Sequence, residues 1–197
     1  MLKSRTGATT LGRVADHADR QDASFLPELP LAGGERIEID EGTTLRVIHT
    51  PGHASNHLCY LLEEEKTLFT GDHVMQSSTV VINPPDGDMA AYVASLRSLA
   101  QEPDIEWLAP GHGFLMEQPK RVFEWIVHHR LQREAKVVEA LRVHGPVPAD
   151  QLLGRVYDDV TSQLHVIAMR SLLAHLYKLR DENVAIEKEG TWSLRTT

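Results

Sequence analysis

Three side chains in this chain directly follow a glycine at the end of an apolar segment, a placement that suits metal ligands. The segments are Thr-Pro-Gly-His ending at His53, Thr-Gly-Asp ending at Asp72 and Pro-Gly-His ending at His112. Because glycine lets the backbone turn sharply, the side chain after it projects from the rim of a sheet. Two imidazoles and one carboxylate suit zinc or another borderline divalent cation. His53, Asp72 and His112 are therefore a predicted set of metal ligands.

The neighbouring histidines have simpler explanations. His49 lies inside a β-branched segment, so we expect it to pack there or to lie at a strand edge. His57 is expected to be a polar loop residue that can orient a metal ligand. His128 and His129 are neighbours on a predicted helix, where side chains diverge by about 100° and do not easily share a metal ion. A single histidine beside a glycine is usually a turn residue, so the argument depends on the recurrence of the pattern.

Short apolar segments are predicted to be the strands that position these residues. Residues 35–40 alternate polar and apolar side chains and residues 44–50 are rich in β-branched ones, so the two form a predicted hairpin. Further strands are predicted at residues 58–62, 67–72 and 105–109.

Two helices are predicted around these strands. Asp88 is a good N-cap residue, and apolar side chains follow it at helical spacing as far as Leu99. Pro119 begins a long helix that continues to His144. The resulting order β-β-β-β-α-β, with helices covering the faces of a sheet, is compatible with half of an αββα sandwich.

The three glycine-containing motifs, in this order and approximate spacing, resemble those of the metallo-β-lactamase superfamily. The resemblance covers nearly the whole chain and points to the branch named after beta-lactamase-like protein 2, in which a small winged-helix domain follows the catalytic domain. It implies a zinc-dependent hydrolase with one or two metal ions, whose metal-bound hydroxide attacks an ester, a thioester or an RNA-like phosphodiester. By position, it implies that His53 binds the first metal, His112 the second and Asp72 both, which makes Asp72 the predicted catalytic residue.

The first motif of that family, His-x-His-x-Asp-His, does not occur in this chain. The resemblance therefore implies three of seven ligands, an N-terminally incomplete domain and weak metal binding. We expect the chain to begin just after that motif, with residues 2–7 as the tail of a helix; the alternative is that these N-terminal residues form a disordered leader. We also expect the missing layer to leave apolar sheet surface exposed. The alternative hypothesis is a truncated, non-catalytic binding or regulatory protein that retains the scaffold and the winged helix.

The loop after Asp72 borders the active site in the family that the chain resembles. Ser77, Ser78 and Thr79 are therefore predicted to contact the substrate. His73 is expected to support a ligand or to face solvent rather than to act in catalysis.

The pattern changes after residue 146. A short helix at 151–157, a longer helix beginning near 161–162 and a hairpin at 183–194 follow one another in winged-helix order. Acidic and basic residues nearly balance there, which favours packing or substrate gating over gripping nucleic-acid phosphates. The predicted domains are a partial metallo-β-lactamase-like domain at 1–116, a connecting helix at 117–146 and a winged-helix-like domain at 147–197.

Composition excludes several classes of protein. The chain has 28 acidic and 20 basic residues and a formal net charge of −8, which disfavours a dedicated binder of duplex DNA. No apolar segment approaches the ~18–20 residues needed to span a membrane. The single cysteine, Cys59, cannot form an internal disulfide and is expected to be a small buried side chain in a strand. We therefore expect a cytoplasmic protein, and the net charge does not exclude a small anionic or single-stranded substrate held at a metal.

Overall fold

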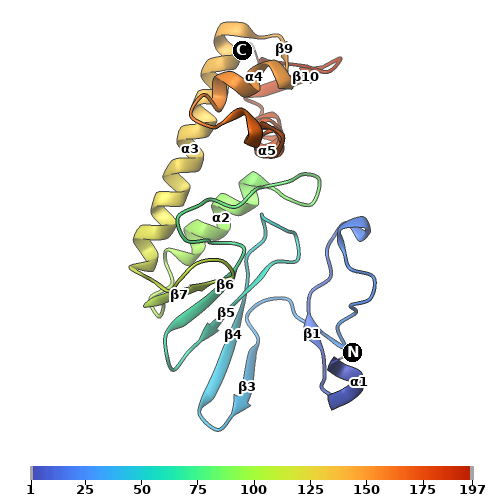
Figure 1. Ribbon diagram of the computed structural model, residues 1–197, viewed down its shortest axis with the longest axis vertical. Coiled ribbons are helices and arrows are strands. Elements are labelled where there is room, and N and C mark those ends of the chain that lie inside the picture. The colour runs from blue at the N-terminus through green and yellow to red at the C-terminus, as the bar shows by residue number, and fades with distance from the viewer. Residues whose placement is uncertain (1, 196–197) are drawn as a thin grey trace.

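The computed structural model describes residues 2–195, which form one six-stranded sheet, two smaller sheets and the helices around them (Figure 1). The helices are α1 (Leu2–Thr6), α2 (Met89–Leu99), α3 (Pro119–His144), α4 (Ala149–Val156) and α5 (His165–Asp181), with 3-10 turns at Ala18–Arg20 and Ser162–Leu164. The strands are β1 (Leu11–Gly12), β2 (Leu29–Pro30), β3 (Arg36–Asp40), β4 (Thr43–His49), β5 (Leu58–Leu62), β6 (Thr67–Gly71), β7 (Trp107–Pro110), β8 (Met116–Glu117), β9 (Val147–Pro148), β10 (Ala185–Lys188) and β11 (Thr191–Leu194). None of the helices in this described part is long and apolar enough to cross a membrane.

The large sheet has the strand order β3-β4-β5-β6-β7-β8. Neighbouring strands from β3 to β6 are antiparallel, as expected for strands joined by short polar turns, whereas β6 and β7 are parallel. A parallel pair needs a crossover connection, and α2 lies in that connection. The predicted order β-β-β-β-α-β is confirmed by β3 to β7.

Helices α2 and α3 cover one face of this sheet (Figure 1). The predicted cap of α2 is confirmed, because the Asp88 carboxylate accepts a hydrogen bond of 2.8 Å from the Ala91 amide. Sheet side chains that alternate toward the helices have no exposed surface, and they pack against buried residues of both helices. These buried residues are Cys59, Leu61, Leu68 and Leu108 on the strands, Tyr92 and Leu96 on α2, and Phe123 and Ile126 on α3.

The opposite face of the sheet is apolar and partly open to solvent. Phe69 is 44% exposed and Trp107 is 37% exposed, although both belong to strands in the interior of the sheet. Tyr60 pairs with Phe69 in the register of β5 and β6, so aromatic side chains lie side by side on this face. The expected exposure of apolar sheet surface is therefore present among the described residues.

The C-terminal third of the chain has winged-helix order around its own core. Helices α4 and α5 are followed by the β10–β11 hairpin, as predicted, and α3 supplies Val137 and Leu141 to the same core. The sequence did not reveal β9, which consists of two residues and pairs with β11 through Val147 and Pro148. A strand this short, with a proline in it, carries no alternating pattern.

The N-terminal segment lies beside the sheet rather than within it (Figure 1). Helix α1 ends before Gly7, whose φ is +69°, so the helical conformation predicted for residues 2–7 is confirmed for Leu2–Thr6. Further along, the Asp16 amide donates to the Ser55 hydroxyl at 2.8 Å, and the Asn56 side-chain amide donates to the Arg13 carbonyl at 3.1 Å. These bonds tie the segment to the turn between β4 and β5.

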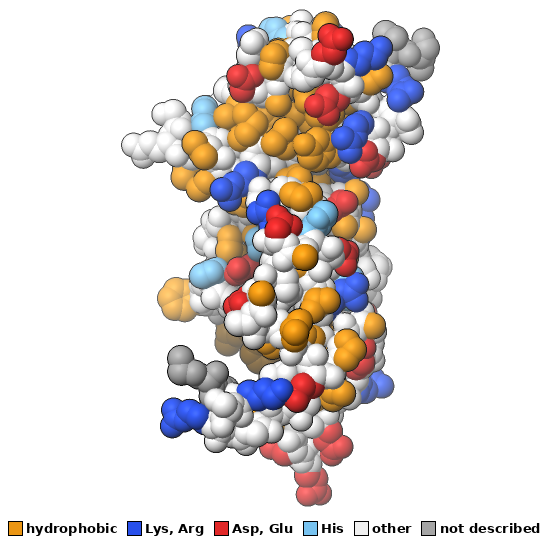
Figure 2. All heavy atoms as spheres, turned by 90° about the vertical axis from the view of Figure 1, so that its right-hand side faces the viewer, with side chains coloured by type: hydrophobic (Ala, Val, Ile, Leu, Met, Phe, Trp, Pro, Cys, Tyr) orange, Lys and Arg blue, Asp and Glu red, His pale blue; other side chains and the backbone are white. Residues whose placement is uncertain are grey.

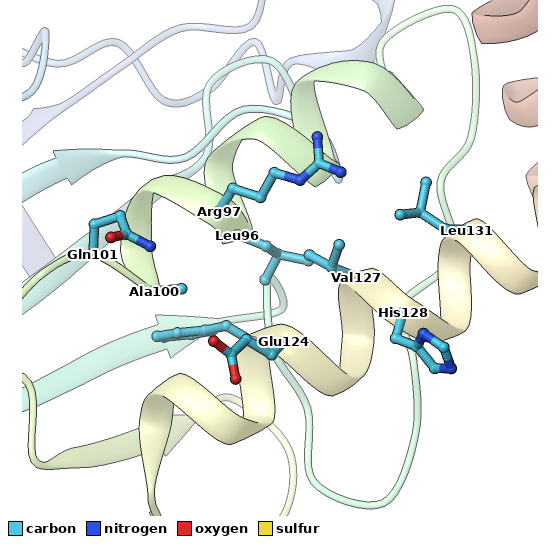
Figure 3. Close-up of a pocket in the computed structure, with 9 residues that line it drawn as sticks. Leu96, Arg97, Ala100, Gln101, Glu124, Val127, His128 and Leu131 are labelled. Carbon is cyan, nitrogen blue, oxygen red and sulfur yellow. The ribbon is translucent and has the colours of Figure 1, made fainter.

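A groove of about 310 Å³ separates α2 from α3 on the outer surface (Figure 3). Its walls include Leu96 and Arg97 from α2 and Glu124, His128 and Leu131 from α3. None of the predicted metal ligands or substrate contacts lines this groove, so we do not assign it to the functional site.

The thiol of Cys59 provides a test of the packing of the large sheet. Cys59 has no exposed surface, as predicted, and burial raises the pKa of its thiol to about 12. Because the thiolate is the reactive form, we expect the native chain to react with dithionitrobenzoate at pH 8 at least about a hundredfold more slowly than the chain in urea. Rapid stoichiometric reaction of the native chain would show that β5 is accessible.

A glycine holds the β4–β5 turn against α2, and this contact gives a second test. Gly52 has φ +138°, and a Cβ atom added there would lie 2.3 Å from the Tyr92 Cα atom. We expect Gly52→Ala to lower the free energy of unfolding by about 2–4 kcal/mol, because backbone strain and overlap add. Gly42→Ala is the matched control, since Gly42 has φ +82° but open space around it, and should cost about 1 kcal/mol. Urea denaturation measures the free energy of unfolding of both variants. An equal decrease for Gly52→Ala and Gly42→Ala would contradict the predicted role of the contact between Gly52 and Tyr92.

Candidate functional site

Asp72 and His112 lie together at one rim of the large sheet. They follow the ends of β6 and β7, and parallel strands end on the same side of a sheet. The Gly111 amide donates to the Gly71 carbonyl at 2.8 Å, which draws the two turns together. His112 Nε2 consequently lies 3.4 Å from Asp72 Oδ1, with 74% of the His112 side chain and 46% of the Asp72 side chain exposed. A side chain at position 111 would approach Asp72 Oδ1 to 3.1 Å, which explains the glycine there.

His53 lies on the turn that follows β4, and its ring orientation is fixed by a backbone group. Its Nδ1 atom is 2.9 Å from the Val81 carbonyl oxygen. A carbonyl can only accept, so Nδ1 carries the hydrogen and Nε2 keeps its lone pair. This tautomer is the one that a histidine needs in order to ligate a metal through Nε2.

A buried carboxylate stabilises the turn that carries His53. Asp86 is 9% exposed and accepts hydrogen bonds from the Ser55 hydroxyl at 2.6 Å and from the Ser55 amide at 3.1 Å. Asp86 was not predicted from the sequence, because it lies 31 positions along the chain from Ser55 in a proline-rich turn.

His57 and His73 lie beneath the rim rather than on it. His57 Nδ1 and the Thr50 hydroxyl form a hydrogen bond of 2.8 Å, and burial, followed by the charge of His53, lowers the pKa of His57 to about 4. His73 has no exposed surface, and burial holds its pKa well below the usual range. Both imidazoles are therefore neutral at pH 7. A solvent-facing His73, one of the two expectations for this residue, is wrong, because its ring packs between His57 and Tyr92 with centroid distances of 5.3 and 4.8 Å.

The chemistry of these donors suits a divalent metal, but their arrangement does not complete a site for one. Within residues 2–195, no three or more His, Cys, Asp or Glu side chains are grouped so that they could hold a metal ion. Asp72 and His112 are brought together, whereas His53 does not form a cluster of three with them. The ligand role of all three residues stays a prediction.

The predicted substrate contacts line a cleft between the two halves of the molecule. Ser77, Ser78 and Thr79 form one wall of a cleft of about 490 Å³, and side chains from α3 and the start of α5 form the others. Ser77 has φ +59°, an uncommon conformation for a residue other than glycine. The role of these three residues also stays a prediction.

Two groups of residues at this cleft were not predicted from the sequence. Trp125 and His129 lie on the long helix α3, one turn apart, and their rings stack over the cleft with centroids 5.6 Å apart. Arg130 is 4% exposed and donates to the Val80 carbonyl, next to the Val81 carbonyl that holds His53. No periodicity distinguishes such residues from a packed or solvated helix face.

Two known families match this chain, one after the other. The metallo-beta-lactamase superfamily matches residues 7–112, and the beta-lactamase associated winged helix domain matches residues 149–192. An atrochrysone carboxyl ACP thioesterase of Aspergillus chevalieri is 32% identical over 160 residues, which cover 76% of this chain and 50% of that protein. A beta-lactamase-like protein 2 homolog of Caenorhabditis elegans is 28% identical over 151 residues, which cover 77% of this chain and 49% of that protein.

A solved structure shows the same architecture. A metallo-beta-lactamase family protein from Thermus thermophilus superposes with a TM-score of 0.74 and 26% sequence identity, covering 87% of this chain and 55% of that one. The chain thus spans about half the length of the curated relatives that it matches. The predicted fold is confirmed, because the family match extends over more than half of the chain and the winged-helix match follows it. The chain belongs to the metallo-beta-lactamase superfamily and carries that superfamily's associated winged-helix domain.

Proposed function

We propose that this chain is part of a metal-dependent hydrolase that attacks an ester, a thioester or a phosphodiester. The observation that carries the proposal is the approach of Asp72 to His112 at the sheet rim, within a chain of this superfamily. A relative named as an acyl-carrier-protein thioesterase favours an acyl thioester within that group of substrates. Zinc is the proposed metal, because imidazole and carboxylate donors suit it.

Each rim residue has a role that its own contacts support. Asp72 Oδ1 lies 3.4 Å from His112 Nε2, so the two side chains face the same point, and the Val81 carbonyl orients His53 so that its Nε2 lone pair is available. A functional centre needs donors in addition to these, since no described trio forms a site. Ser77, Ser78 and Thr79 are proposed to contact the substrate from the cleft wall.

The winged-helix domain is proposed to pack against the catalytic part rather than to read DNA. Exposed positions at the start of α5 are apolar, with Val166 76% and Ile167 43% exposed. A helix that enters a DNA groove needs basic and hydrogen-bonding side chains at such positions. The net charge of −8 also disfavours contacts with phosphates.

A second candidate function is a non-catalytic binding or regulatory protein built on this scaffold. It is favoured by the absence of a metal-holding trio among residues 2–195 and by the exposure of His112. In that case the winged-helix domain and the cleft beside it would bind the ligand or partner.

Zinc binding separates the two candidates. We expect zinc to bind the purified chain weakly at one site, and His112→Ala or Asp72→Asn to weaken it at least about tenfold, because each removes a donor. Isothermal titration calorimetry, with the metal content checked by mass spectrometry, measures the affinity. His128→Ala is the matched control, since His128 is an exposed histidine on α3 away from the rim.

The outcomes differ clearly. If zinc binds the wild-type chain and His112→Ala equally, the rim is not a metal site and the non-catalytic candidate is favoured. If binding depends on Asp72 and His112, an acyl thioester and a phosphodiester should be compared as substrates by release of thiol or alcohol. If the variant His53→Ala also loses zinc binding, His53 is identified as the third zinc ligand.

A further inference from the structure

A cleft of about 490 Å³ between the two cores has features of a ligand site that the rim residues do not explain. One wall is the loop at residues 77–81, the second is the middle of α3, and the third is the segment that ends in the start of α5. We call it the interdomain cleft. Clefts of this size, placed between domains, are common sites for small molecules.

The open part of the interdomain cleft has apolar and aromatic side chains beside the polar Ser77 and Ser78 and the Asp159 carboxylate, which Arg133 binds. Trp125 is 55% exposed, and its ring stacks on that of His129 with an interplanar angle of 19°. Burial, followed by the charges of Arg130 and Arg133, lowers the pKa of His129, so the imidazole is neutral at pH 7. Leu164 and Ile167 on the third wall are 50% and 43% exposed. A flat or extended apolar group fits between such surfaces.

A buried arginine without an acidic partner also lines the interdomain cleft. Arg130 is 4% exposed, and within the described residues no carboxylate lies within 4.0 Å of its guanidinium group. Glu134, one helical turn away, is bound to His175 and Lys178 instead. Arg130 donates to the Val80 carbonyl, and its guanidinium carbon lies 5.4 Å from the centre of the Tyr92 ring, but its Nε atom has no hydrogen-bond partner. A buried cation in this state is unfavourable unless an anion compensates it.

The next arginine on the same helix is buried in a different state. Arg133 is 7% exposed, yet it binds the Asp159 carboxylate through two nitrogens at 2.7 and 3.0 Å. Its charge is therefore compensated within the chain. Tyr157, which also lines the interdomain cleft, has a buried hydroxyl without a partner. The cleft thus contains one uncompensated cation and one unused hydroxyl donor.

We propose that the interdomain cleft binds a carboxylate attached to a flat apolar body. The carboxylate compensates Arg130 and accepts from the Tyr157 hydroxyl, while the apolar body lies on the Trp125–His129 stack. Ser77, Ser78 and Thr79, the proposed substrate contacts, also line this cleft, so the ligand would lie beside or within the proposed substrate site. Its binding is measured at equilibrium without hydrolysis, so either proposal can fail while the other holds.

The position of Arg130 also connects the interdomain cleft to the rim. Arg130 donates to the Val80 carbonyl, and His53 donates to the carbonyl of the adjacent Val81. A ligand whose carboxylate binds Arg130 is therefore expected to change the hydrogen bond between Arg130 and Val80, and with it the position of the Val81 carbonyl that holds the His53 ring. The NMR signal of the His53 ring is expected to shift when the cleft is filled.

Two small molecules of similar shape, one charged and one neutral, test whether binding requires the carboxylate of the ligand, without any substitution in the protein. We expect 2-naphthoate to bind the metal-free wild-type chain at least about tenfold more tightly than the neutral 2-naphthalenemethanol, because a hydrogen bond to a charged group is lost with the alcohol. Calorimetry or ¹H–¹⁵N NMR titration measures both affinities. Equal affinities, or no binding of 2-naphthoate, would overturn the proposal.

Variants then locate the site. Trp125→Ala should weaken 2-naphthoate about threefold to tenfold, because one face of the stack is lost. Trp107→Ala is the matched control, since Trp107 is a half-exposed tryptophan on the sheet. Arg130→Gln should remove the preference for the carboxylate, and Arg142→Gln, on the exposed end of the same helix, should leave it unchanged. Undiminished binding by Trp125→Ala would place the probe elsewhere and refute the assignment, even if Arg130→Gln fails to fold.

Discussion

Helix α3 is the element on which the rest of the structure depends, because it belongs to both hydrophobic cores. Phe123 and Ile126, near its start, are buried against the large sheet, and Val137 and Leu141, near its end, are buried in the winged-helix core. A continuous helix of 26 residues is stiff over its length, so these contacts fix how the two cores sit relative to each other. Figure 2 shows the elongated shape that results and the hydrophobic side chains gathered on one face of the C-terminal part.

The middle of α3 has to be polar and buried at once, because it passes between the cores. Arg130 and Arg133 occupy this stretch, and both direct guanidinium nitrogens to backbone carbonyls, of Val80 and Val156 respectively. Val80 lies in a loop and Val156 is the last residue of α4, so neither carbonyl has a regular backbone partner, and a side-chain donor satisfies each one. The winged-helix domain therefore affects the rim indirectly: it helps to bury the helix that holds the loop on which His53 rests.

Much of the fold could be predicted because its signals are local. Alternation in residues 35–40, the Asp88 cap and the glycine before each rim residue are readable within a few positions of sequence. Contacts made across the fold were less visible. Trp125 fits an apolar helical stripe, yet it is 55% exposed, because that part of the stripe faces a cleft rather than a core. For His73 the sequence left two expectations open, support of a ligand or exposure to solvent, and the fold buries the residue completely.

At the rim, the positions of Asp72, His112 and His53 on the sheet, rather than their residue types, decide which of them come together. Strand pairing brings Asp72 to His112, since β6 and β7 are hydrogen-bonded neighbours. His53 reaches the rim from β4, which is separated from β6 by β5, so nothing in the sheet forces it into the same cluster. Its orientation comes instead from the Val81 carbonyl, on a loop held by Arg130. The sequence motifs supply the three predicted donors, whereas their convergence depends on the loops that carry them and, in the proposed site, on further donors beside Asp72 and His112.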